Sequence, residues 1–144
     1  MLIRRQLTEE TKAQLQQELG SLLSGREEIV FACLHGSFLE PHGFRDVDIG
    51  VWVVPERVPG ERAFDYELDL SLWLEQRSPQ PVPMDVKVLN YAPLGFRYAA
   101  SSGTPLLLRD LKAWYTFREE TWRDYWDFMP LARAMLRDLL SPEY

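Results

Sequence analysis

Apolar and polar residues alternate with a period of two in residues 46–54 and again in residues 84–90. Because successive side chains of a β-strand point to opposite faces, both segments are predicted to be strands with one apolar face toward a core. On the first strand, valine and isoleucine form the apolar face, and Asp46 and Asp48 lie on the other. On the second, Asp85 and Lys87 lie opposite the apolar residues.

Two apolar runs that do not alternate predict further strands. Residues 28–34 are continuously apolar after Glu28 and stop at His35–Gly36–Ser37, which predicts a buried central strand. Residues 106–109 predict a short edge strand.

Apolar residues recur at helical spacing in the remaining segments. The predicted helices cover residues 8–23, 61–77, 93–100 and 111–140. Thr8 is a suitable N-cap for the first of them, and Gly25 follows its end. Together the elements predict an α/β (α+β) fold, a small mixed sheet with helices on one face, the valine face. The aspartates would then lie on an open face.

The last predicted helix is rich in aromatic residues. Its stripe most compatible with covering the sheet consists of Leu111, Tyr115, Trp122, Trp126 and Met129. A second set extends the apolar arc, and consists of Trp114, Phe117, Tyr125 and Phe128. We expect this second set to contact a partner, because large surface aromatics are typical of interfaces. The alternative is that a kink or break at Pro130 folds the helix back and buries them.

Length and charge limit the classes of function. The chain has 144 residues and predicts one domain over residues 1–144, with a core of about 8–109 and a helical region of about 110–144. A formal charge of −6 disfavours direct nucleic-acid binding. A single cysteine excludes an intramolecular disulfide, and no apolar run is long enough to cross a membrane. We therefore expect a cytoplasmic protein with no membrane association.

The aspartates of the two alternating strands form the candidate chemical site. Asp46 and Asp48 have Cα atoms about 6–7 Å apart along a strand, and Asp85 on a neighbouring strand would lie about 5 Å across. Carboxylates this close raise one another's pKa unless a cation binds between them. Magnesium, which prefers hard oxygen ligands, fits such a cluster.

A solvent-facing Asp-x-Asp on an exposed strand is the simpler interpretation of the pair alone. The turn at Gly36–Ser37, just upstream, favours a phosphate site instead, because glycine lets the backbone approach a phosphate closely and serine adds a hydroxyl. Lys87, on the face of Asp85, is a further candidate for binding nucleotide. Arg45 is predicted by alternation to point away from the aspartate face.

The segment LHGSFLEPHGFRDVDIGV (34–51), followed by MDVKV (84–88), resembles the minimal nucleotidyltransferases of the DNA polymerase beta superfamily. The shared pattern is Gly-Ser after an apolar residue, a short connection, Asp-x-Asp on a strand, and a third aspartate on a later strand. The resemblance implies that Gly36 and Ser37 bind the nucleotide triphosphate. It also implies that Asp46 and Asp48 hold two Mg²⁺ ions.

Asp85 matches the third carboxylate of the family, which binds one metal and helps to activate the attacking hydroxyl. All three aspartates are therefore expected to be both metal ligands and catalytic residues. The implied reaction is transfer of AMP from ATP, with release of pyrophosphate.

The minimal members of this family resemble antitoxins that are encoded beside a HEPN-type ribonuclease toxin. The resemblance therefore implies AMP transfer to a toxin tyrosine, with the toxin as the partner protein and a homo-oligomer as a further possibility. The alternatives are a non-enzymatic antitoxin that masks the toxin, and a nucleotidyltransferase acting on a small-molecule hydroxyl. A glycosyltransferase is disfavoured by the chain length and the Gly-Ser turn.

Overall fold

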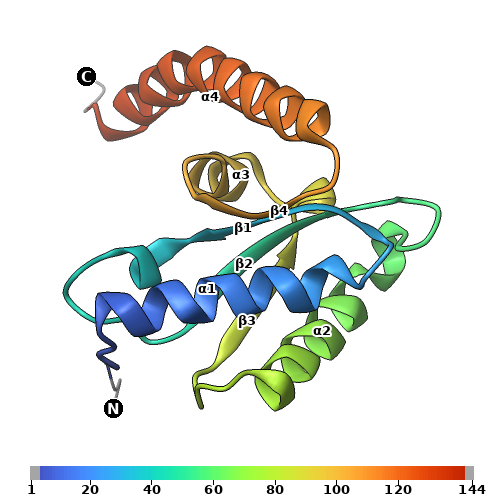
Figure 1. Cartoon of the computed structure of the whole chain (residues 1–144). Coiled ribbons are helices and arrows are strands. Elements are labelled where there is room, and N and C mark those ends of the chain that lie inside the picture. The colour runs from blue at the N-terminus through green and yellow to red at the C-terminus, as the bar shows by residue number, and fades with distance from the viewer. Residues whose placement is uncertain (1–3, 142–144) are drawn as a thin grey trace.

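The computed structural model of the chain describes residues 4–141, in which a four-stranded sheet is flanked by four α-helices (Figure 1). The elements in chain order are α1 (Glu9–Ser24), β1 (Ile29–His35), η1 (Gly36–Leu39), β2 (Val47–Val53), η2 (Gly60–Arg62), α2 (Ala63–Arg77), β3 (Met84–Val88), η3 (Leu89–Tyr91), α3 (Leu94–Ser101), β4 (Thr104–Leu108) and α4 (Leu111–Leu140). Within these residues, no helix is both long and apolar enough to cross a membrane.

The strand order is β3-β2-β1-β4. β1 runs antiparallel to both β2 and β4, whereas β2 and β3 are parallel, so the sheet is mixed as the sequence predicts. The four strands lie where the apolar patterns place them, within a few residues. β4 begins at Thr104 rather than residue 106, and its Pro105 is tolerated because β4 is an edge strand.

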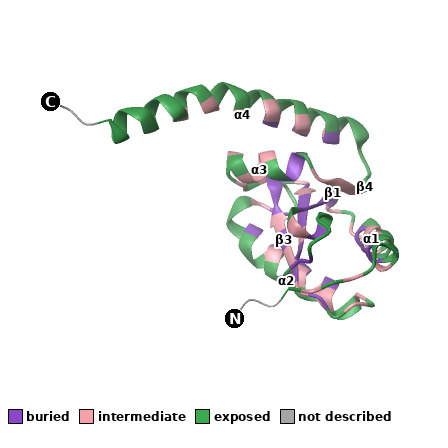
Figure 2. Ribbon diagram, turned by 90° about the vertical axis from the view of Figure 1, so that its left-hand side faces the viewer, coloured by how far each residue is buried: buried purple, intermediate pink, exposed green. Residues whose placement is uncertain are grey.

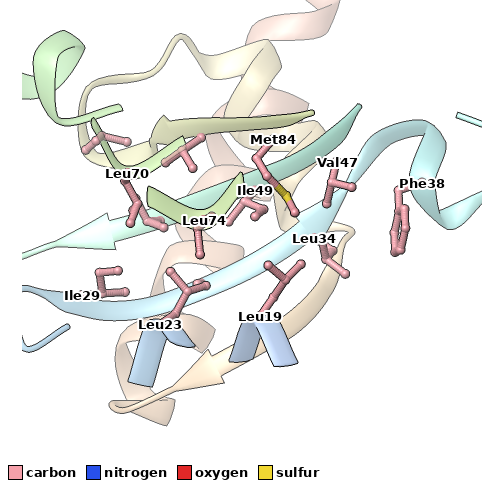
Figure 3. Close-up of a cluster of buried hydrophobic side chains, with 14 of the residues drawn as sticks. Leu19, Leu23, Ile29, Leu34, Phe38, Val47, Ile49, Leu70, Leu74 and Met84 are labelled. Atoms are coloured by element: carbon pink, nitrogen blue, oxygen red, sulfur yellow. The ribbon is translucent and has the colours of Figure 1, made fainter. Parts of the chain in front are cut away.

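The valine face of the sheet carries the larger core. α1 begins with the Thr8 side chain accepting a hydrogen bond from the Thr11 amide, so the predicted N-cap is confirmed. Leu19 of α1 and Leu70 of α2 are fully buried in one cluster with Ile49 of β2, and Figure 3 shows the side chains of this cluster. This packing explains why the alternating valines and isoleucines of β2 are all buried.

The opposite face is not open along its whole length. α3 and the first half of α4 cover it, so the prediction that helices lie on only one face is wrong in this respect (Figure 1). Phe31 of β1 is the centre of this second core, with its ring centroid 5.2 Å from that of Trp114 and 5.8 Å from that of Trp52. The part of this face that carries the aspartates lies beyond these aromatic contacts.

Polar side chains of α2 bind the free edge of β3. The amides of Met84, Val86 and Val88 donate hydrogen bonds of 2.9, 3.0 and 2.7 Å to the side chains of Glu75, Ser71 and Glu67, respectively. The three acceptors recur every fourth residue of the helix, and the three donors every second residue of the strand. This match satisfies an edge that would otherwise be open to further strand pairing.

The buried stripe of α4 differs from the predicted one. Trp114, Phe117 and Thr121 are buried, whereas Tyr115 and Trp126 of the predicted stripe are 52% and 64% exposed. The predicted partner-facing set thus divides: Trp114 and Phe117 are core residues, Tyr125 is half-buried, and Phe128 is exposed. Both stripes have helical spacing, and the packing against β1 and α3 selects the second one.

Pro130 does not break α4. The helix is continuous from Leu111 to Leu140 and curves gently in Figure 2, so the chain does not fold back at this residue. Pro130 is exposed on the outer side of the helix.

Two leucines of α2 offer a matched test of this packing. Leu70→Ala should lower the free energy of unfolding by about 2–5 kcal/mol, because Leu70 is fully buried and its loss leaves a cavity. Leu72→Ala, on the same helix but 57% exposed, should change it by less than about 0.5 kcal/mol. Urea denaturation of both variants measures the difference, and equal losses would contradict the described packing.

Candidate functional site

A tight turn at the end of β1 forms one wall of the site. Gly36 has a φ of 81°, a left-handed conformation that side chains other than glycine rarely adopt. A Cβ atom on Gly36 would overlap the carboxylate of Asp48. The Gly36–Ser37 turn therefore lies directly against Asp48, and this close approach explains the requirement for glycine.

Three carboxylates meet beside this turn. Asp46 immediately precedes β2, Asp48 lies within it, and Asp85 lies on β3, where the parallel register makes Asp85 the direct neighbour of Asp48. Each residue offers one carboxylate oxygen, and these oxygens all lie within 4.8 Å of one another. The juxtaposition that strand alternation predicts is thus present, with all three side chains half-buried.

The cluster changes the acid–base chemistry of Asp48. Burial is the main cause that raises the pKa of Asp48 to about 7, and the nearby charges of Asp46 and Asp85 raise it further. The positive charge of Arg45 acts in the opposite direction. Strand alternation placed Arg45 away from the site, but Arg45 precedes β2, so the alternation rule does not govern it.

His35 is a site residue whose position the sequence pattern did not reveal. It is the last residue of β1 and pairs with Asp48 in the antiparallel register, rather than lying in a turn. Its side chain is 6% exposed, and its Nε2 atom has no hydrogen-bond partner among residues 4–141. Burial lowers the pKa of His35, against the opposing effect of Asp85 and Asp46. Phe31 and Cys33 of β1 lie on the face opposite the valines, and extending this alternation by one step would have placed His35 on the same face as the aspartates.

Phe96 of α3 completes this side of the site. Its ring packs edge-on against His35, with ring centroids 5.0 Å apart. Phe96 also lines a cavity of about 350 Å³ together with Lys87, Tyr91 and Phe64. Lys87, two residues after Asp85 on β3, lies in the wall of this cavity, and Phe96 connects the cavity to His35.

Aromatic packing and a buried amine hold the loop between β1 and β2 in place. Phe38, directly after Ser37, is buried and packs edge-on against Phe44 with centroids 4.9 Å apart. The Nζ atom of Lys12 donates hydrogen bonds of 2.8 and 2.9 Å to the carbonyl oxygens of Phe38 and Glu40. These contacts fix the loop that carries Gly36, Ser37 and Asp46.

No protein family and no curated protein matches the sequence. Solved structures do match the fold. A toxin–antitoxin complex of MntA, in which two aspartates separated by one residue are changed to glutamate, gives a TM-score of 0.65 at 16% identity, covering 88% of this chain and 98% of that chain. A tri-AMPylated HEPN toxin of Shewanella oneidensis in complex with its MNT antitoxin gives 0.65 at 16% identity, covering 90% and 99%.

A further match is a toxin–antitoxin structure with AMP-PNP, with a TM-score of 0.63 at 17% identity over 93% of this chain and 100% of that chain. The likeness therefore extends over nearly the whole chain in each case. It confirms that this protein has the fold of the minimal nucleotidyltransferase antitoxins, as the resemblance of the Gly-Ser and Asp-x-Asp motifs implied.

The raised pKa of Asp48 predicts a specific pH dependence in metal-free buffer. The folded chain holds the Asp48 proton more tightly than the unfolded chain. Removing this proton therefore lowers the free energy of unfolding. The free energy of unfolding of the wild-type protein should fall, relative to that of Asp48→Asn, as the pH rises from 3.8 to about 7. Above pH 7 the difference between the two proteins should stay constant. Because solvent screens this half-buried group, we expect a loss of about 1–2 kcal/mol.

Chemical denaturation in EDTA at several pH values measures this difference. The lowered pKa of His35 acts in the opposite direction, but it is common to both proteins. Asp69→Asn, at an exposed position of α2, is the matched control and should follow the wild type. If the free energies of unfolding of wild type and Asp48→Asn differed by the same amount at every pH in this range, the raised pKa of Asp48 would be contradicted.

Proposed function

We propose that this protein is a metal-dependent nucleotidyltransferase that transfers AMP from ATP to a hydroxyl group, and that its acceptor is a tyrosine of a HEPN-type ribonuclease toxin. The observation that carries the proposal is the convergence of Asp46, Asp48 and Asp85 directly beside the Gly36–Ser37 turn. A fold shared with nucleotidyltransferase antitoxins supports it.

The chemistry of the three carboxylates fits divalent metal ions. They offer only hard oxygen donors, which Mg²⁺ prefers, and they leave room for water and phosphate ligands. The raised pKa of Asp48 indicates that the cluster without a cation favours a protonated carboxyl group, which a divalent ion would displace. Asp46, Asp48 and Asp85 would hold two Mg²⁺ ions, which when bound stabilise negative charge on the attacking and leaving oxygens.

The remaining residues would bind the nucleotide and handle the proton. Gly36 and Ser37 would contact the triphosphate, since the turn lies against Asp48, and Lys87 would supply positive charge from the neighbouring cavity. The acceptor oxygen would attack the α-phosphorus of ATP, a new P–O bond would form, and the bond to the β-phosphate would break to release pyrophosphate. The Asp85 carboxylate would take the proton of the acceptor hydroxyl.

The toxin as acceptor is supported by the structures that share the fold. One contains a tri-AMPylated HEPN toxin with an MNT antitoxin, and another a toxin–antitoxin with AMP-PNP. The charge of −6 on this chain also suits a basic ribonuclease partner.

Metal binding should stabilise the protein through the carboxylate cluster. At a Mg²⁺ or Mn²⁺ concentration of about 100 times the dissociation constant, the free energy of unfolding should rise by about 2.7 kcal/mol. Asp48→Asn should lose most of this gain, whereas Asp69→Asn should keep it. Thermal unfolding with and without metal measures the effect, and an equal shift in Asp48→Asn would place the metal elsewhere.

Nucleotide transfer should depend on the same carboxylates. With α-labelled ATP, Mg²⁺ and the product of the neighbouring gene, the wild-type protein should label that product if it is the proposed toxin. Asp46→Asn and Asp48→Asn should each reduce the rate about 100-fold or more, because metal ligands stabilise the transition state. Asp69→Asn again serves as the control, and mass spectrometry locates the label on the toxin.

The outcomes separate the alternatives. Toxin binding and inhibition without any labelling, in wild type and variants alike, would indicate a non-enzymatic antitoxin. Labelling of a small molecule but not of the toxin would support nucleotidyl transfer and show that the acceptor is a small molecule. Undiminished transfer in EDTA would refute the metal-dependent mechanism.

A further inference from the structure

The cavity of about 350 Å³ that contains Lys87 lies beside β3, between the beginnings of α2 and α3. Lys87 follows Asp85 by two residues on the same face of the strand, so their Cα atoms are about 6–7 Å apart. The cavity therefore adjoins any molecule bound at the three aspartates. The side chains that matter most in its lining are Lys87, Phe64, Glu67, Tyr91 and Phe96.

Three aromatic rings line this cavity. Phe64 and Tyr91 are 65% and 44% exposed, and Phe96 is half-buried. The Tyr91 hydroxyl donates a hydrogen bond of 2.9 Å to the carbonyl oxygen of Val58, and Phe96 packs edge-on against His35, so two of the three rings are held in place. Accessible aromatic rings around a preformed hollow are typical of a site that binds a planar, largely apolar group.

The strand order places the carboxylates between the Gly36–Ser37 turn and the cavity. The turn follows β1, Asp48 lies on β2 and Asp85 lies on β3, and these strands are consecutive neighbours in the sheet. The turn lies against Asp48, whereas most of the cavity lining belongs to β3, to α2 and to the segment that follows β3. A phosphorus atom held at the aspartates would thus have the turn on one side and the cavity on the other.

An in-line displacement determines which substrate group lies on each side. The attacking and leaving oxygens lie on opposite sides of the phosphorus. In the proposed function, on which this step rests, the leaving pyrophosphate lies at the Gly36–Ser37 turn. The acceptor oxygen must then approach from the side of Asp85, the proposed proton acceptor, and of the cavity. The nucleoside is joined to the phosphorus through an oxygen off this line, so the geometry directs the acceptor to the cavity rather than the nucleobase.

Exposed apolar surface continues from the cavity along α2. Leu68 and Leu72 follow Phe64 at four-residue spacing and are 51% and 57% exposed. Residues four apart lie on one side of a helix, so these three side chains form a continuous apolar strip that begins at the cavity. A small metabolite in the cavity would leave this strip uncovered, whereas a protein chain that inserts one side chain into the cavity can cover it. The strip therefore favours a protein as the acceptor.

We propose that this cavity is the acceptor subsite, and that it binds the phenol ring of a tyrosine presented by a protein chain that lies along α2. The ring packs among Phe64, Tyr91 and Phe96, and its hydroxyl points toward Asp85. The phenol oxygen forms the new bond to the α-phosphorus of ATP as the bond to the β-phosphate breaks. Its proton passes to the Asp85 carboxylate, and pyrophosphate leaves on the side of the Gly36–Ser37 turn.

Binding of a small tyrosine probe tests the cavity without any transfer reaction. N-acetyltyrosinamide should bind the wild-type protein and shift the amide signals of the lining residues in two-dimensional NMR spectra. Phe64→Ala should weaken this binding about threefold or more, because a contact between aromatic rings is lost. Phe128→Ala, the same change at a similarly exposed position of α4 outside the cavity, should leave it unchanged. If adenosine shifts these signals and N-acetyltyrosinamide does not, the cavity binds the nucleobase and the proposal is wrong.

Transfer kinetics test the same assignment in the complete reaction, with the product of the neighbouring gene as acceptor. Phe64→Ala should raise the KM for the acceptor about tenfold and leave the KM for ATP unchanged, because the lost contact is made only with the acceptor. Leu72→Glu should raise the KM for the acceptor without weakening the binding of N-acetyltyrosinamide, since Leu72 lies on α2 outside the cavity. Circular dichroism verifies that both variants remain folded.

Failure of the subsite and failure of the proposed function give different results. Transfer with an unchanged KM for the acceptor in Phe64→Ala, or a raised KM for ATP alone, would reject the subsite and retain the nucleotidyltransferase. Transfer in which Leu72→Glu has no effect on the acceptor would reject the path along α2. Absence of transfer by the wild-type protein to any acceptor would reject the proposed function, and the subsite with it.

Discussion

The parallel pairing of β2 with β3 decides whether this chain has a site at all. Asp85 reaches Asp48 only because the two residues are direct neighbours in this register, and a shift by one residue would turn Asp85 to the valine core. The register is held from both sides of β3. Its apolar residues pack in the core, and its outer amides bind the side chains of Glu67, Ser71 and Glu75 on α2. β3 is thereby hydrogen-bonded along both of its edges.

The close placement of the three aspartates opposes the stability of the fold electrostatically. Three carboxylates are held together although burial and mutual repulsion raise the pKa of Asp48 to about 7. The surrounding structure resists their separation, because the loop before Asp46 is anchored by Phe38, Phe44 and the buried amine of Lys12. An arrangement that opposes stability and is nevertheless rigidly supported is typical of functional sites. It supports the metal and phosphate chemistry that we propose for this end of the sheet.

α4 combines two roles along one apolar face. Its first half closes the second core around Phe31, where Trp114 and Phe117 pack on the sheet. Its second half presents the continuation of that face to the outside, past Tyr125, whose ring stacks on Tyr98 with centroids 3.7 Å apart. The helix thus links the folded core to a surface suited to another protein, and an outward-facing Pro130 leaves its course unbroken.

The sequence by itself determined most of the strands and helices, and the strand faces on which Asp48 and Asp85 lie. A period of two specifies opposite faces of a strand, so Asp48 and Asp85 had to lie away from the valines of their own strands. The position of Asp46, which precedes β2, and the pairing of β2 with β3 depend on the tertiary structure. The sequence did not determine which side of a helix faces the core. In α4, the Tyr115 and Trp126 stripe and the Trp114 and Phe117 stripe have equally good helical spacing, and only contacts with β1 and α3 distinguish them.

The same ambiguity applies to α2, where Phe64, Leu68 and Leu72 have helical spacing but are exposed, while Leu70 and Leu74 are buried. Tertiary structure also decided that α3 and α4 cover part of the aspartate face, and that His35 and Phe96, far apart in sequence, meet beside the site. Periodicity describes angles about the axis of one element. The direction of the core about that axis is set by the other elements, and these are brought together only when the chain folds.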